Sequence, residues 1–64
     1  MRGAPSWPSV RDPVVVDGVK LRIREITPAG IAVCRQHFAP HEEAKVSVER
    51  LVWDRRAGLW RVAS

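Results

Sequence analysis

The segment from Lys45 to Val62 constrains the fold of this chain more than any other stretch; it reads KVSVERLVWDRRAGLWRV. Two apolar stretches flank a short polar run, Asp54–Gly58. The run ends in glycine, the residue that most easily adopts the positive φ of a tight turn. This pattern is typical of a β-hairpin.

Pairing Asp54 with Leu59 would set the register of this hairpin, placing Trp53 opposite Trp60 and Leu51 opposite Val62. Because side chains alternate across a strand, these last four residues would share one apolar face. The opposite face would carry Arg50, Val52 and Arg61. We therefore expect one face of the hairpin to be buried and the other to be mostly cationic.

Upstream, the short apolar run Val14–Val16 ends at Asp17-Gly18, a strong tight-turn signal. The strand that follows alternates two kinds of residue. Its expected inward residues are Val19, Leu21 and Ile23, and its expected outward residues are Lys20, Arg22 and Arg24. The alternation slips by one residue at Glu25-Ile26, which predicts a β-bulge that returns Ile26 to the core.

Thr27–Gly30 has the proline and glycine of a turn, and 31–36 reads as a strand with Ile31 and Val33 inward. These two are expected to pair with Ile26 and Ile23 across the bulge. Residues 37–44 break the alternation. Here Pro40, Glu42 and Glu43 suggest one helical turn, and Phe38 is expected to close one end of the core.

Two interpretations of residues 40–52 remain open. One continues a long strand in which Glu49-Arg50 shifts the alternation; the other is a helix with Ala44, Val48, Leu51 and Val52 on one face. The β-branched valines count against the helix, because their χ1 freedom is restricted there.

Together these signals predict an all-β domain over residues 14–64, with a Pro-rich extended arm over residues 1–13. Five short, strongly bent antiparallel strands in so short a chain favour an SH3-like or comparable small barrel, since closure removes the exposed edges of a flat sheet. Fold alone does not specify function.

The cysteine content and the pattern of apolar residues indicate the cellular compartment. The single cysteine, Cys34, excludes an internal disulfide framework and favours a reducing cytoplasm. The sequence contains neither an apolar run long enough to span a membrane nor a signal-peptide pattern. We therefore expect a cytoplasmic protein without a membrane partner.

Cys34, His37 and His41 have a spacing that zinc ligands can show. If the strand continues, however, Cys34 and His37 lie on opposite faces, and no second cysteine is present. A thiol in the middle of a strand also lacks the accessible, electropositive surroundings of a catalytic cysteine. We expect no metal, no cofactor, no small-molecule substrate and no enzyme activity.

The excess of basic residues, 11 against 7 acidic ones, is almost entirely arginine. Arginine suits bidentate phosphate contacts, although the bias of a GC-rich genome explains the same excess. The residues expected to contact nucleic-acid phosphates, without base readout, are Lys20, Arg22, Arg24, Arg50, Arg55, Arg56 and Arg61.

The alternative function is a protein–protein adaptor, or an accessory subunit of a larger assembly such as those of phages and mobile elements. Trp7 in the arm would either fold back onto the domain or anchor a partner. Val14 and Val16 would lie on an edge strand that adds to a partner's sheet.

Overall fold

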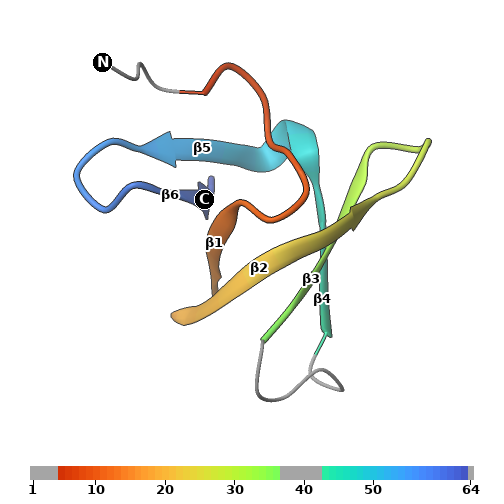
Figure 1. The fold of residues 1–64 in the computed structure, drawn as a ribbon, viewed down its shortest axis with the longest axis horizontal. Helices are drawn as coiled ribbons and strands as arrows, with labels where there is room; N and C mark the ends of the chain where they lie inside the picture. The colour runs from red at the N-terminus through yellow and green to blue at the C-terminus, as the bar shows by residue number, and fades with distance from the viewer. Residues whose placement is uncertain (1–4, 37–42, 64) are drawn as a thin grey trace.

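The computed structural model of the chain describes residues 5–36 and 43–63, which form six strands and one 3-10 turn. Figure 1 labels the strands β1 (Pro13–Val16), β2 (Val19–Ile26), β3 (Ile31–Arg35), β4 (Glu43–Ser47), β5 (Leu51–Asp54) and β6 (Leu59–Val62). The 3-10 turn η1 (Val48–Arg50) joins β4 to β5. The predicted all-β class is confirmed, with six strands in place of the expected five.

The strands form one sheet in the order β4-β3-β2-β1-β6-β5, which curls into a half-barrel (Figure 1). Neighbouring strands are antiparallel except β1 and β6, which run parallel, so the expectation of a purely antiparallel sheet was wrong. A parallel pair needs a long crossover connection. Here the segment from β2 through β5 forms the crossover connection between β1 and β6.

The β5–β6 hairpin has the predicted register. Trp53 lies opposite Trp60, and Asp54 lies opposite Leu59. The indole rings meet edge to face, with centroids 5.3 Å apart and planes at 69°. Gly58 has φ +68 and donates its N–H to the carbonyl of Asp54. This positive φ turns the chain back into β6.

The first turn and the bulge also agree with the sequence. Asp17 and Gly18 both have positive φ, as the tight turn between β1 and β2 requires. The ladder between β2 and β3 shifts register between Ile23 and Glu25, which is the predicted bulge. Val19 is the exception in β2, because it is 39% exposed and does not belong to the core.

The predicted orientation of β3 was wrong. Ala32 and Cys34, both fully buried, belong to the main core cluster. They pair with Ile26 and Ile23, the partners that were expected for Ile31 and Val33. Val33 is also buried, at 8% exposure, but lies outside the main cluster. The run Ile31–Cys34 is apolar at every position, so its pattern does not distinguish the two faces.

The segment after β3 resolves the two interpretations of residues 40–52 over its described part. Glu43–Ser47 is a strand and Val48–Arg50 a single 3-10 turn, so the alternative helix does not form there and the preferred long strand is interrupted. The turn supplies the change of alternation expected at Glu49-Arg50. Phe38, Pro40 and Glu42 lie outside the described residues.

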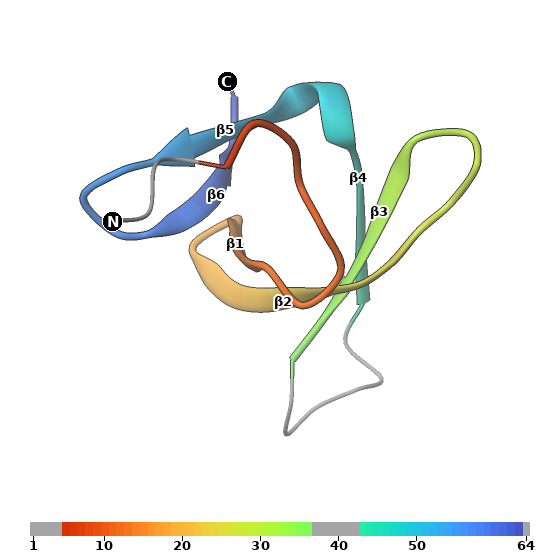
Figure 2. The same ribbon diagram turned by 45° about the horizontal axis from the view of Figure 1, so that its top comes forward.

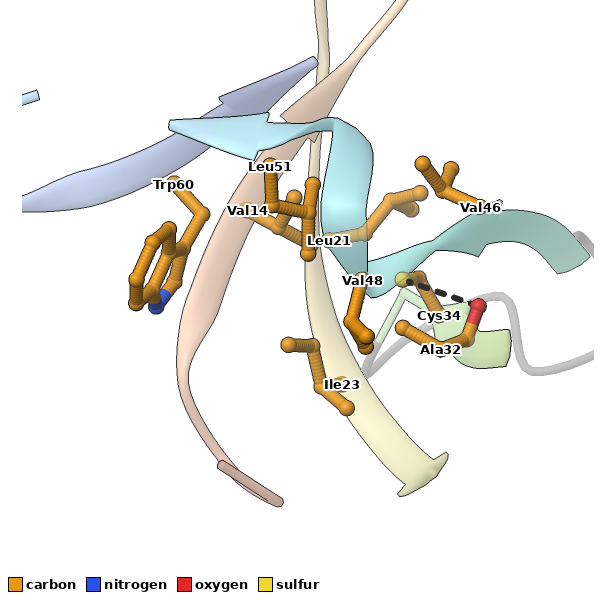
Figure 3. Packing of buried hydrophobic residues seen from close by; sticks show 9 residues of the cluster. All are labelled: Val14, Leu21, Ile23, Ala32, Cys34, Val46, Val48, Leu51 and Trp60. Atoms are coloured by element: carbon orange, nitrogen blue, oxygen red, sulfur yellow. Dashed lines mark hydrogen bonds between the residues drawn. The ribbon is translucent and has the colours of Figure 1, made fainter. Parts of the chain in front are cut away.

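The core lies on the inner face of the curl, where side chains from every strand and from η1 meet (Figure 3). Its buried members are Val14, Leu21, Ile23, Ala32, Cys34, Val46, Val48, Leu51 and Trp60. Among the described residues, no polar or charged residue is buried. The core is therefore held by apolar burial, at roughly 25 cal/mol per Å² removed from water.

The N-terminal segment crosses the open side of the half-barrel before it enters β1 (Figure 2). Arg11 donates its N–H to the carbonyl of Ile23, and Ile23 donates its own N–H to the carbonyl of Asp12. Asp12 also accepts the indole N–H of Trp60 through Oδ2, at 3.0 Å. The arm therefore folds back onto the domain through these residues.

Candidate nucleic-acid interface

Two strands, β2 and β6, place cationic side chains in one row on the outer face of the sheet, on either side of β1. The register aligns Lys20 of β2 with Val15 of β1, and Val15 with Arg61 of β6. Their Cα atoms span two strand spacings, so Lys20 and Arg61 lie about 10 Å apart. Because the adjacent row Leu21, Val14 and Trp60 is buried, strand alternation points Lys20 and Arg61 outward, and both are exposed.

Arg22 and Arg24 extend this cationic surface along β2. Arg22 lies opposite Pro13 on one side and Arg35 on the other, and its guanidinium donates to the carbonyl of Arg11 at 2.9 Å. Arg24 falls at the register shift and has no partner residue in β3. Both side chains are exposed.

Arg50 approaches the same face from η1. With Arg61 it lines a shallow depression that is completed by Val15, the Asp17-Gly18 turn, Val62 and Ala63. The carbonyl of Arg50 accepts the N–H of Ala63 at 2.7 Å, which fixes the end of η1 against β6. Two arginines therefore border one depression, and Asp17 also lies on its rim.

Arg55 and Arg56 lie at the tip of the β5–β6 hairpin, and both are exposed. Asp54 organises this tip, because its Oδ1 accepts the backbone N–H groups of Arg56 and Ala57, each at 3.0 Å. Its Oδ2 accepts the Nε–H of Arg61 at 2.5 Å. The hydrogen bond from Arg61 and the backbone N–H of Ala57 lower the pKa of the Asp54 carboxyl, which therefore stays charged.

The structure thus brings Lys20, Arg22, Arg50 and Arg61 to one outer face, with Arg24 at the bulge and Arg55 and Arg56 at one end. We call this set the basic face. Arg61 forms an ion pair with Asp54. Within residues 5–36 and 43–63, the other members have no carboxylate oxygen within 4.0 Å. Their charges are available to an anionic ligand.

The aromatic side chains lie elsewhere. Trp60 is 4% exposed and Trp53 packs against the core, as predicted. Trp7 is 57% exposed and lies beside Pro28, Gly30 and η1. The arm folds back, yet the Trp7 side chain remains accessible.

The predicted edge strand at Val14–Val16 was wrong. β1 lies between β2 and β6 and is paired on both sides. Val14 is fully buried, and Val16 packs against the core, so neither presents an open strand edge. The strands at the margins of the sheet are β4 and β5.

Cys34 is a buried thiol. It is fully buried, its Sγ donates weakly to the carbonyl of Ala32, and burial raises the pKa of the thiol. Burial thus disfavours the thiolate that nucleophilic chemistry needs. The described residues contain no cluster of three or more metal-ligating side chains. His37 and His41 lie outside those residues.

Arg11 is a residue that the sequence interpretation missed. It has φ +81, an uncommon conformation for a non-glycine residue, in a turn closed by the Asp12 N–H to the Ser9 carbonyl. The turn signal was present in Ser9, Asp12 and Pro13. Through its carbonyl, Arg11 holds the guanidinium of Arg22 on the basic face.

Comparisons with protein-family models, curated proteins and solved structures return no match to this chain. In the part of the chain that the structure describes, no helix has the length and apolar character needed to cross a bilayer. Functional inference therefore depends on the surface just described.

Proposed function

We propose that this chain is a non-enzymatic binding module that contacts nucleic-acid phosphates through the basic face. The supporting observation is the alignment of Lys20 and Arg61 in one outward row, with Arg22 and Arg50 beside it. Phosphates are the anions that guanidinium groups bind in a bidentate manner. The module acts without a cofactor.

We propose that binding does not depend on base sequence. Base readout on a sheet surface uses exposed aromatic or polar side chains. In the outward row, Val15 lies between Lys20 and Arg61, and Val52 lies beside Arg61. Trp53 and Trp60 face the core. Contacts of this composition fix position on a phosphate backbone and carry little sequence information.

We further interpret the curled sheet as an SH3-like barrel left open between its marginal strands β4 and β5. Strand β4, the 3-10 turn and β5 follow one another along the chain, and the core fills the inner face. The outer face is thereby left for binding.

The experiment is a titration of labelled single-stranded and duplex DNA of mixed sequence, followed by fluorescence anisotropy at increasing salt. Each neutralised duplex phosphate contributes a slope of about −0.9 to log K against log salt. Contact with three or four phosphates gives a slope near −3 on the same relation. Affinity should change little when the base sequence is shuffled.

Matched variants locate the contact. Arg22→Gln with Arg24→Gln removes two charges from β2, and Arg55→Gln with Arg56→Gln removes two from the hairpin tip; each should weaken binding and flatten the slope. Lys45→Gln is the control, because Lys45 lies on β4 and pairs with Glu43 at 3.8 Å. Absence of binding at about 20 mM salt, where screening is weak, would refute the proposal.

The second candidate function is a protein–protein adaptor that uses the N-terminal segment. Its supporting observation is the 57% exposure of Trp7 and the 50% exposure of Val10 on a segment that is otherwise fixed to β2. Buried aromatic anchors dominate protein interfaces. A partner captured by the wild type in nuclease-treated lysate, and lost with Trp7→Ala, would favour this function over the first.

A further inference from the structure

The β5 strand presents an open edge at one margin of the sheet (Figure 1). Among the described residues, β6 is the strand that pairs with β5, and it occupies one side only. An edge strand with free backbone groups is a template for another strand. Val52 on this strand is also 55% exposed, so its side chain is available to a partner.

The backbone pattern shows which groups are free. Ala63 donates its N–H to the carbonyl of Arg50, so alternate residues of β5, Val52 and Asp54, direct their backbone groups toward β6. Leu51 and Trp53 then direct theirs toward the open edge. Consistently, the N–H of Leu51 donates to the carbonyl of Val48 in η1 and not to β6. The Leu51 carbonyl and both backbone groups of Trp53 remain for a partner strand.

The sequence around this edge is complementary to itself. Arg50–Asp54 reads RLVWD, with Val52 at its centre. Arg50 ends η1, and its carbonyl already follows the ladder with β6 by accepting the N–H of Ala63. In an antiparallel pair of two such segments centred on Val52, Arg50 of each copy lies opposite Asp54 of the other. Opposite charges that face each other across strands stabilise the pair, and like charges destabilise it.

We propose that two copies of this chain associate through their β5 edges, in antiparallel register about Val52. The two exposed Val52 side chains then cover each other on the outer face. The Trp53 N–H of each copy donates to the Leu51 carbonyl of the other, because those groups point toward the open edge. This two-fold arrangement uses the same surface on both subunits, as closed homodimers do.

Neighbouring registers are poorer. Moving the centre to Trp53 places Val52 opposite the second copy's Asp54, which sets an apolar side chain against a carboxylate. Moving it to Leu51 places Val52 opposite Arg50, which sets an apolar side chain against a guanidinium. Only the register centred on Val52 places apolar residues opposite apolar residues and Arg50 opposite Asp54. The interface is small, so the dimer is weak and forms at high protein concentration.

The first test is sedimentation equilibrium of the chain without nucleic acid, from about 10 μM to about 1 mM, a range that covers weak association. A concentration-dependent dimer is expected. Val52→Lys places two ammonium groups opposite each other and should raise the dissociation constant at least about tenfold. Val10→Lys is the matched control, because Val10 is 50% exposed, lies on the N-terminal segment and gains the same charge. It should leave the dimer unchanged.

A charge swap tests the register independently of Val52. Arg50→Glu and Asp54→Arg should each weaken the dimer about fivefold, since this exposed pair occurs twice. The double variant should restore it. Circular dichroism verifies that each variant is folded.

Three results would overturn the proposal. They are a monomer at about 1 mM, association that Val52→Lys leaves intact, and single charge variants that the double variant does not rescue. A monomer that still binds DNA would overturn the dimer and leave the proposed function standing, because the sedimentation test contains no nucleic acid.

Discussion

Trp60 donates its indole N–H to Asp12, a residue 48 positions earlier in the chain, with Nε1 and Oδ2 3.0 Å apart. The same carboxylate oxygen accepts the backbone N–H of Ser9 at 2.9 Å. The carbonyl of Asp12 accepts the N–H of Ile23. One aspartate thus joins the N-terminal segment, β2 and the hairpin, and it satisfies the one polar atom that Trp60 carries into the core.

Removing either partner of this contact should destabilise the domain. Trp60→Ala should cost about 3–5 kcal/mol, because it empties the core next to Val14 and Trp53. That loss is comparable to the whole stability expected for so small a domain. Denaturant unfolding followed by circular dichroism measures it. Trp7→Ala, at a 57% exposed side chain, is the control and should stay within about 0.5 kcal/mol.

The hydrogen bond itself can be separated from the packing. Asp12→Ala should cost about 1–3 kcal/mol, because it leaves the indole N–H of Trp60 without its acceptor. Trp60→Phe removes the donor. If the hydrogen bond is responsible, Asp12→Ala should lower the free energy of unfolding less in the Trp60→Phe background than in the wild type. A double-mutant cycle measures this difference. Strictly additive losses would contradict this account of Asp12.

Gly58 should tolerate substitution poorly for a purely conformational reason. A Cβ at this position would meet no atom within 4 Å, but φ is +68. A β-branched residue is strained there, so Gly58→Val should destabilise the domain by about 1–2 kcal/mol. Gly58→Asn should cost less, because asparagine visits this region more readily. Equal losses in the two variants, measured by denaturant unfolding, would argue against backbone strain as the cause.

Because Asp54 stabilises the domain in its charged form, the domain should lose stability in acid. The Arg61 hydrogen bond, followed by the Ala57 N–H, holds the pKa of its carboxyl below the ordinary value. A lowered folded-state pKa means that the stabilisation is complete above about pH 4 and is lost as pH falls through the folded pKa. Asp54→Asn should therefore be less stable than the wild type at pH 7. The difference should narrow toward about pH 2. A difference that is constant with pH would contradict this assignment.

Chelation should leave the fold unchanged. Cys34 is fully buried among apolar side chains, so its sulfur would have to leave the core to bind zinc with His37 or His41. Thermal unfolding with and without a chelator, and after addition of zinc, measures this. A lower midpoint with chelator would show that metal contributes to folding, as it does in metal-stapled domains.

Local signals in the sequence were sufficient for the turns and for the hairpin register. Gly18, Gly30 and Gly58 lie at turns and have positive φ, as their positions indicated. The pairing of Trp53 with Trp60 follows from a short loop and strict alternation, both of which are local properties. The exposure of Arg22 and Arg61 follows from the same alternation, because charged side chains are rarely buried without a partner.

Tertiary structure alone decided the orientation of β3 and the place of β1. Ile31–Cys34 is apolar on both faces, so only packing against β2 and β4 selects Ala32 and Cys34 for the core. Val14 pairs with Trp60 in a parallel contact between distant segments, which no local pattern encodes. Because of that contact, β1 is a central strand, β5 is an edge strand in place of β1, and Lys20 and Arg61 lie in one row. Long-range pairing of this kind depends on how the whole chain buries its apolar surface, and short-range propensity does not specify it.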